Sequence, residues 1–242
     1  MQIIDANDYN LRTAVYLFER GKLEFLVIPM LHIGSKEFYQ EVSQELEKCD
    51  FIIYEGVGLK KLVSVWSSYR RFAKRLGLRY QNDELVMKKF QHKLIHADYA
   101  GKAAEDAWKK IPLTGRLLFR FSLIIGLTFL SFKENKRSFA KTFRKNEGTD
   151  DQLWFMKIGK SNSVHNFIME KRNNIIMEKI DEQLQNERKD DVRIGVIYGA
   201  AHMPGIIHHL MNKHKFTIKD SWFLTVLWLS KQNFRFKRKE DN

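Results

Sequence analysis

The chain has 242 residues and a formal net charge of +13, and 44% of its residues are hydrophobic. This length supports one large or two small domains with a substantial core, and the composition excludes disorder as the main state. The single cysteine, Cys49, cannot form an internal disulfide, which argues against a disulfide-bonded secreted scaffold. Residues 1–10 lack the apolar run of a signal peptide, so we expect a cytoplasmic protein.

The first part of the chain predicts a hairpin followed by a strand, a helix and a second strand. Residues 12–28 have the composition of two strands joined by a turn at Gly21. Ser35 is the expected N-cap of a helix over 36–48, where apolar residues recur at four-residue spacing. Residues 50–56 then form a short apolar strand. Two strands connected through a helix predict parallel pairing with a right-handed connection.

The middle of the chain, about 60–152, predicts a mostly helical insert. Helical spacing covers three stretches: 59–76, 83–95 and 106–132, the last interrupted at Pro112 and Gly115. The chain then becomes polar and basic.

The last part predicts a long helix and a further set of strands. An apolar stripe at four-residue spacing indicates a helix over 163–186, and Arg172 lies on that stripe. Further elements are a strand at 192–198, a helix near 205–212, and strand candidates at 216–219 and 222–229. We therefore expect a single α/β domain over 1–242. It would have a mixed, largely parallel central sheet flanked by helices, two pseudo-symmetric halves around the insert, and a basic tail at 231–242.

A similar motif containing one histidine occurs near each end of the chain. Residues 26–35 and 196–205 each contain an apolar run, a Gly or Pro, a histidine and a Gly-containing turn. In open α/β sheets, ligands bind beyond the carboxyl ends of the strands. The repetition therefore predicts that His32 and His202 share one site, as metal ligands or as acid–base groups. The alternative is that each histidine is hydrogen-bonded within its own turn.

Glu55 ends the predicted strand 50–56 on the same side as Phe51 and Ile53. A carboxylate there needs a paired charge or a cation, because a buried unpaired charge is costly. Two histidines and one carboxylate suit a divalent cation that keeps a bound water, the predicted nucleophile. The predicted metal ligands are therefore His32, Glu55 and His202. The alternative for Glu55 is a salt bridge to a loop lysine.

Arg172 is the one charged residue on the apolar stripe of the helix over 163–186. An arginine on that face requires a partner, and Glu55 or a substrate carboxylate would supply one. Its expected role is to orient Glu55 or to bind a developing oxyanion. Alternatively, its long side chain reaches solvent. The predicted catalytic residues are thus Glu55, Arg172, His32 and His202.

Other polar residues carry weaker signals. His92 and His96 are four apart, but no Glu follows the first as a zinc-protease motif requires. Asp98 is expected to cap a helix, or else to support the site as a second acid. We expect His208, His209 and His214 on a solvated helix face. The sequence contains no Walker loop, dinucleotide fingerprint or nucleophile elbow.

The positive charge is concentrated in two clusters, 133–145 and 231–239, which follow the apolar stretches 121–132 and 222–229. They indicate either a solvated face with a basic tail or peripheral binding to an anionic membrane surface. Neither apolar stretch reaches the roughly 20 residues of a spanning helix. We do not expect nucleic acid as a partner, because no recognised binding module accompanies the charge.

Three motifs resemble those of the TraB/GumN/Tiki superfamily, which is broadly related to the erythromycin esterase and ChaN-like proteins. They are Gly199-Ala200-Ala201-His202-Met203-Pro204-Gly205, Glu170-Lys171-Arg172-Asn173 and Tyr54-Glu55-Gly56. The first histidine motif departs from the family pattern, since Pro29 stands where the family has Gly. Proline holds φ near −65° and excludes the positive-φ turn open to glycine.

The resemblance implies an α/β fold with two pseudo-symmetric halves and a site between them. It also implies metal-dependent hydrolysis, since Tiki proteins resemble peptidases that use manganese or cobalt. We therefore predict a hydrolase of peptide or amide bonds that uses manganese, cobalt or zinc and takes a peptide or small acidic substrate. The alternative is a non-catalytic protein of the same fold that binds a ligand or peptide. One form of this alternative places the protein at a membrane surface.

Overall fold

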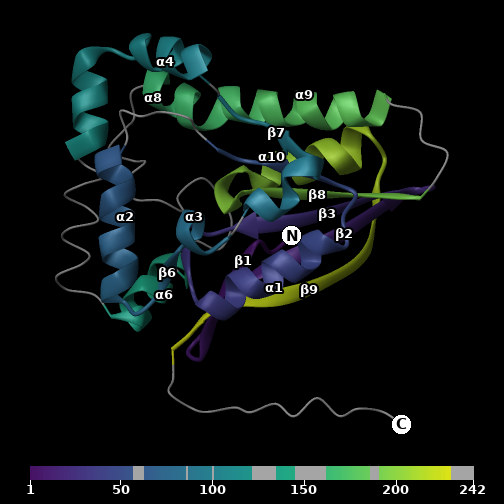
Figure 1. The fold of residues 1–242 in the computed structure, drawn as a ribbon, viewed down its shortest axis with the longest axis horizontal. Coiled ribbons are helices and arrows are strands. Elements are labelled where there is room, and N and C mark those ends of the chain that lie inside the picture. The colour runs from purple at the N-terminus through teal and green to yellow at the C-terminus, as the bar shows by residue number, and fades with distance from the viewer. Residues whose placement is uncertain are drawn as a thin grey trace.

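The computed structural model describes residues 1–56, 63–85, 87–99, 101–121, 135–144, 162–185 and 191–229. The predicted basic tail at 231–242, the apolar residues 122–132 and part of the basic cluster at 133–145 lie outside these ranges. Within them the chain has the expected α/β fold, with helices on both sides of a mixed sheet (Figure 1).

Seven strands form the central sheet, which is parallel in its core. They are β1 (Ile4–Ala6), β2 (Asn10–Arg20), β3 (Leu23–Met30), β5 (Phe51–Tyr54), β7 (Leu94–His96), β8 (Val192–Gly199) and β9 (Thr217–Trp228). The hydrogen-bonded order is β1-β2-β3-β8-β5-β7, and β9 pairs with β2. The pairs β3–β8, β8–β5 and β5–β7 are parallel, whereas β2 is antiparallel to all its partners. A separate small sheet joins β4 (Ile33–Gly34) to β6 (Arg79–Tyr80).

The helical elements connect and cover these strands. They are α1 (Lys36–Glu47), α2 (Val63–Arg75), α3 (Gln81–Glu84), η2 (Met87–Lys93), α4 (Gly101–Lys109), α6 (Lys136–Arg144), α8 (Asn162–His165), η3 (Asn166–Glu170), α9 (Lys171–Gln185), η4 (Ala200–His202), α10 (Met203–His208) and η5 (His209–Lys213). Residues 113–121 are also helical. Two of these elements, η3 and η5, are single π-helical turns.

The predicted hairpin and the helix after it are confirmed. Gly21 turns the chain between β2 and β3 with φ of 60°, a conformation that glycine adopts without steric cost. The hydroxyl of Ser35 accepts a hydrogen bond of 3.1 Å from the backbone N–H of Phe38, as expected of an N-cap. The strands on either side of α1, β3 and β5, are parallel as predicted, but they are not neighbours. β8 lies between them, and its largely buried, apolar residues suit this central position in the sheet.

Alternating side chains of the parallel strands divide the core into two layers. On β3, Leu26 and Ile28 pack with Phe38 of α1, whereas Val27 faces the other side. There it packs in a cluster that includes Ile176 of α9 and residues of α10. Figure 1 shows α1 on one side of the sheet and α9 with α10 on the other. The period of two along each strand thus determines which layer each side chain joins.

Three details differ from the sequence-based expectation. Residues 94–96 form strand β7 rather than the end of a helix, so the region 60–152 contributes to the central sheet. Helical residues 113–121 begin after Pro112 and continue through Gly115 without a break. The candidates at 216–219 and 222–229 are one strand, β9, whose register shifts let it follow β2. Among the described residues, no helix is long and apolar enough to cross a bilayer.

Candidate functional site

The two histidine motifs leave the sheet side by side. Met30 at the end of β3 is in register with Gly199 at the end of β8, and the two strands are parallel. On the other side of β8, Tyr54 at the end of β5 is in register with Ile197. The segments that carry His32, Glu55 and His202 therefore emerge from three adjacent parallel strands at one edge of the sheet.

Glu55 is held by two donors at the centre of this edge. One carboxylate oxygen, Oε1, accepts a hydrogen bond from Nη2 of Arg172, and Oε2 accepts one from the backbone N–H of Gly199. Only 14% of the Glu55 side chain is exposed. Burial alone would raise its pKa, but Arg172, His32 and His202 outweigh that effect and lower the pKa to about 2. Glu55 is therefore a carboxylate at neutral pH.

The ion pair between Arg172 and Glu55 includes a second acid. The guanidinium of Arg172 donates from Nε to Oδ1 of Asp98 over 3.0 Å and from Nη2 to Oδ2 over 2.8 Å. Asp98 also accepts backbone hydrogen bonds from Gly56 at 3.1 Å and Tyr99 at 2.7 Å. Arg172 is 7% exposed, which rules out the alternative in which its side chain reaches solvent.

Of the two expectations for Asp98, a helix cap or a second acid at the site, its contacts with Arg172 fit the second. Asp98 lies two residues after the end of β7, Glu55 lies directly after the end of β5, and β5 and β7 are adjacent. The signal for this strand is the short apolar run Leu94-Ile95 shortly before an acid, although the helical spacing of 83–95 extends over the same residues. Because one guanidinium lies between two carboxylates, the trio carries net negative charge when both acids are ionised. Burial raises the pKa of Asp98, so this acid gains a proton more readily than Glu55 does.

His202 is buried beside the same network. Its Nδ1 is 2.7 Å from Oδ1 of Asn173, and its ring meets the ring of Tyr198 edge-on with centroids 4.9 Å apart. Burial lowers the pKa of His202 to about 4, against the opposing effect of Glu55. The imidazole is therefore neutral at pH 7.

His32 is half-buried and has a comparable partner. Its Nδ1 is 3.1 Å from Oε1 of Gln81, and its backbone carbonyl accepts a 2.9 Å hydrogen bond from the Gln81 N–H. The ring also lies edge-on to Tyr69, with centroids 5.6 Å apart. In both His32 and His202 a side-chain amide oxygen faces Nδ1. Neither Nε2 has a hydrogen-bond partner in the part of the chain that the structure describes.

An open pocket of about 460 Å³ adjoins this edge of the sheet. Glu55, Gln81 and Ile197 line it, and Asp83 and Lys88 also contribute to its lining. Because Glu55 and the partner of His32 both border the pocket, a bound molecule would lie beside the predicted site.

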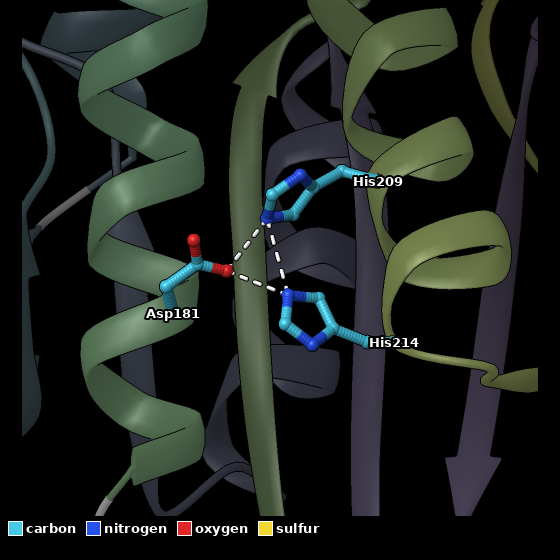
Figure 2. A group of neighbouring side chains, drawn as sticks. All are labelled: Asp181, His209 and His214. Atoms are coloured by element: carbon cyan, nitrogen blue, oxygen red, sulfur yellow. Dashed lines mark hydrogen bonds and ion pairs between the residues drawn. The ribbon is translucent and has the colours of Figure 1, made fainter.

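A different group of side chains has metal-ligand spacing in the structure. Asp181, His209 and His214 place one ligand atom each within 4.8 Å of the others, so this group can hold a metal ion (Figure 2). Across the described ranges, His32, Glu55 and His202 do not reach that spacing.

The prediction of a solvated helix face was wrong for two of the three later histidines. His209 is 9% exposed and His214 is partly buried, whereas His208 is exposed as expected. The reason is that His209 and His214 turn toward α9 and bind Asp181. The other pair, His92 and His96, does not share a helix: His92 lies in η2 and His96 in β7.

Comparisons of the chain with protein-family models, curated proteins and solved structures found no match.

Proposed function

We propose that this protein is a metal-dependent hydrolase of the TraB/GumN/Tiki type, acting on a peptide or amide bond. In this proposal His32, Glu55 and His202 bind a divalent cation at the carboxyl ends of β3, β5 and β8. The observation that carries the proposal is that the two histidine rings have the same hydrogen-bonding arrangement. Each has an amide oxygen at Nδ1, from Gln81 or Asn173, and each leaves Nε2 without a described partner.

That arrangement is typical of histidines that bind metals. A ligating imidazole commonly donates its other N–H to an oxygen acceptor, which fixes the tautomer and the ring orientation. With the proton on Nδ1, the lone pair of Nε2 is available to a cation. Two such nitrogens and a carboxylate that stays ionised are a suitable ligand set for zinc, manganese or cobalt. When Asp98 is ionised as well as Glu55, the net negative charge of these two acids and Arg172 also favours a cation.

The fit requires the side chains to rearrange. Each oxygen of Glu55 already accepts one hydrogen bond but retains a second lone pair, so the carboxylate can keep Arg172 and Gly199 and still bind a cation. His32 and His202 would move toward it, because the three groups do not yet reach metal-ligand spacing. When bound, the cation would lower the pKa of a bound water and polarise the scissile carbonyl.

The protein's own side chains have supporting roles in this proposal. Arg172 orients Glu55 and holds its pKa low, and because it is shared with Asp98 it is a positioning residue rather than an oxyanion donor. Gln81 and Asn173 orient the two imidazoles. The adjoining pocket would receive the substrate, and Lys88 in its lining offers a positive charge to a substrate carboxylate.

The test measures metal content and hydrolysis together. The second group of potential ligands is removed first, by His209→Ala and His214→Ala, so that bound metal reports on one site. We expect this variant to bind one manganese, cobalt or zinc ion and to cleave members of a peptide library. The further change His202→Ala should abolish both, whereas His208→Ala, at an exposed histidine, should affect neither.

Unchanged metal content after His202→Ala would contradict the proposed ligand set. If the protein binds a metal or a peptide but cleaves no peptide in the presence of manganese, cobalt or zinc, the proposal that it is a hydrolase is contradicted. That result would support instead the alternative of a non-catalytic binding protein.

A further inference from the structure

A second cluster of imidazoles and a carboxylate joins α9 to the end of the α10–η5 segment. Oδ1 of Asp181 is 2.7 Å from Nε2 of His209 and 2.6 Å from Nε2 of His214, and the two nitrogens are 3.3 Å apart. Figure 2 shows both rings pointing from the α10–η5 side toward Asp181 on the facing helix. Three ligand atoms from three points of the chain therefore face a common centre.

A π-helical turn places the two histidines on one face. Residues five apart in an α-helix point about 140° away from each other, since each residue turns the chain by about 100°. Residues 209–213 instead form the π-turn η5, and the N–H of His214 bonds to the carbonyl of His209 over 3.3 Å. The wider turn brings position 214 back over position 209. Such turns are rare and occur frequently at functional sites.

The spacing of the nitrogens matches that of a tetrahedral metal centre. With zinc–nitrogen bonds of about 2.0–2.1 Å, two ligand atoms of a tetrahedron lie about 3.3 Å apart. The two Nε2 atoms already have this separation. Oδ1 of Asp181 lies closer to each nitrogen than that and would move back by about 0.6 Å to admit the ion. A rotation of the partly exposed Asp181 carboxylate would make this movement.

The residues around the cluster determine which oxygen of Asp181 can bind the ion and allow water to reach the ion. Nζ of Lys213 is 2.7 Å from the other oxygen of Asp181, which leaves Oδ1 as the ligand atom. The Asp181 side chain is 24% exposed, compared with 10% for His209 and 16% for His214. The imidazoles are therefore held by packing, while a water can reach the fourth position.

The cluster is separate from the proposed hydrolase site. Asp181 lies nine residues after Arg172 on α9, a distance of about 13 Å along the helix axis. We infer that Asp181, His209 and His214 form a second metal site, with three protein ligands and one open position. It binds Zn²⁺ through one carboxylate oxygen, two Nε2 atoms and a water, and it fastens η5 to α9. Imidazole ligands select zinc-like transition metals over magnesium and calcium, which prefer oxygen ligands.

The experiment uses the full chain without an affinity tag, carrying His32→Ala and His202→Ala so that the first site cannot contribute. Co²⁺ is titrated while its visible absorption is recorded, and Zn²⁺ is then added as a competitor. We expect one equivalent of Co²⁺ to bind with the absorption of a tetrahedral ion and to be displaced by Zn²⁺. His214→Ala should weaken binding by more than about 100-fold, since even loss of a supporting residue costs 10–100-fold. His208→Ala is the matched control and should bind normally.

Thermal unfolding provides a second readout. Zn²⁺ should raise the melting temperature of the His208→Ala protein but not that of the His214→Ala protein. If His214→Ala does not fold, Asp181→Asn tests the same site while keeping the shape of the side chain. Equal Co²⁺ affinity in the ligand variants and the control would overturn the inference, as would the absence of binding in the starting protein. Because the first site is disabled throughout, none of these outcomes depends on the proposed hydrolase.

Discussion

Arg172 and Asp98, 74 residues apart in the sequence, form a two-point ion pair in which Nε and Nη2 meet Oδ1 and Oδ2 at 3.0 and 2.8 Å. The same guanidinium holds Glu55, so one positive charge compensates two largely buried carboxylates. This pairing joins α9 to the ends of β5 and β7. It explains why a charged residue occupies the apolar stripe of the helix.

Arg172→Met should therefore destabilise the protein strongly. The substitution preserves apolar contact but leaves Glu55 and Asp98 without their cation, and breaking a buried ion pair costs about 3–5 kcal/mol. Urea unfolding at pH 7 measures the change. Arg70→Met is the matched control, because Arg70 and its partner Asp83 are 59% and 41% exposed. A loss of stability in Arg172→Met no larger than in this control would show that the trio contributes little.

Gly199→Ala should disturb Glu55 in a way that Gly56→Ala does not. A Cβ at Gly199 would lie 3.0 Å from Oε2 of Glu55. That carboxylate is held in place by the Gly199 N–H at Oε2 and by Arg172 at Oε1. A Cβ at Gly56 would meet nothing nearer than 3.5 Å. Overpacking of this kind costs about 1–3 kcal/mol. We expect a loss in that range for Gly199→Ala by chemical denaturation and a smaller one for Gly56→Ala; the reverse order would refute the close contact.

Cys49 should be unreactive in the folded protein. Burial raises its pKa to about 12 from an ordinary value near 9, and the side chain is 3% exposed. At pH 8 about one thiol in ten thousand is ionised. A thiol-specific disulfide reagent should therefore label Cys49 only after unfolding. Rapid labelling of the native protein at pH 8 would contradict this burial.

The same shift predicts that stability falls at alkaline pH. Above about pH 9 the thiol of the unfolded chain ionises while the folded thiol stays neutral, so rising pH favours unfolding until the folded pKa is reached. At pH 10, ionisation of Cys49 in the unfolded chain lowers the free energy of unfolding by about 1 kcal/mol. Urea unfolding of wild type and Cys49→Ala at pH 8 and 10 should show a smaller decline in the variant. Parallel declines would exclude Cys49 as their source.

Lys215→Gly should stabilise the protein. Lys215 follows the π-turn with φ of 59°, the one positive φ among the described non-glycine residues. The left-handed conformation costs a residue with a Cβ about 1–2 kcal/mol, and glycine is the usual residue at this position after a helix. We expect a gain of about 1 kcal/mol in urea unfolding. Lys215→Ala keeps the Cβ and should show no such gain, so an equal effect of both changes would point to the lost charge.

Local patterns were sufficient for much of the fold. The composition of residues 12–28 with Gly21 predicted the hairpin, and Ser35 with its four-residue spacing predicted α1. The period of two along 50–56 also put Glu55 on the side of the sheet that α9 covers, where Arg172 meets it. These features depend on the backbone conformation and periodicity of a single segment, which are visible in its own residues.

The partners of these segments were decided only by the tertiary structure. β8 inserts between β3 and β5, Asp98 joins Arg172 through a strand too short to recognise, and a π-turn directs His209 and His214 to Asp181. Each outcome depends on contacts between residues far apart in the chain. Strand order and ion-pair choice follow from which buried surfaces and charges pack together best, and no single segment carries that information.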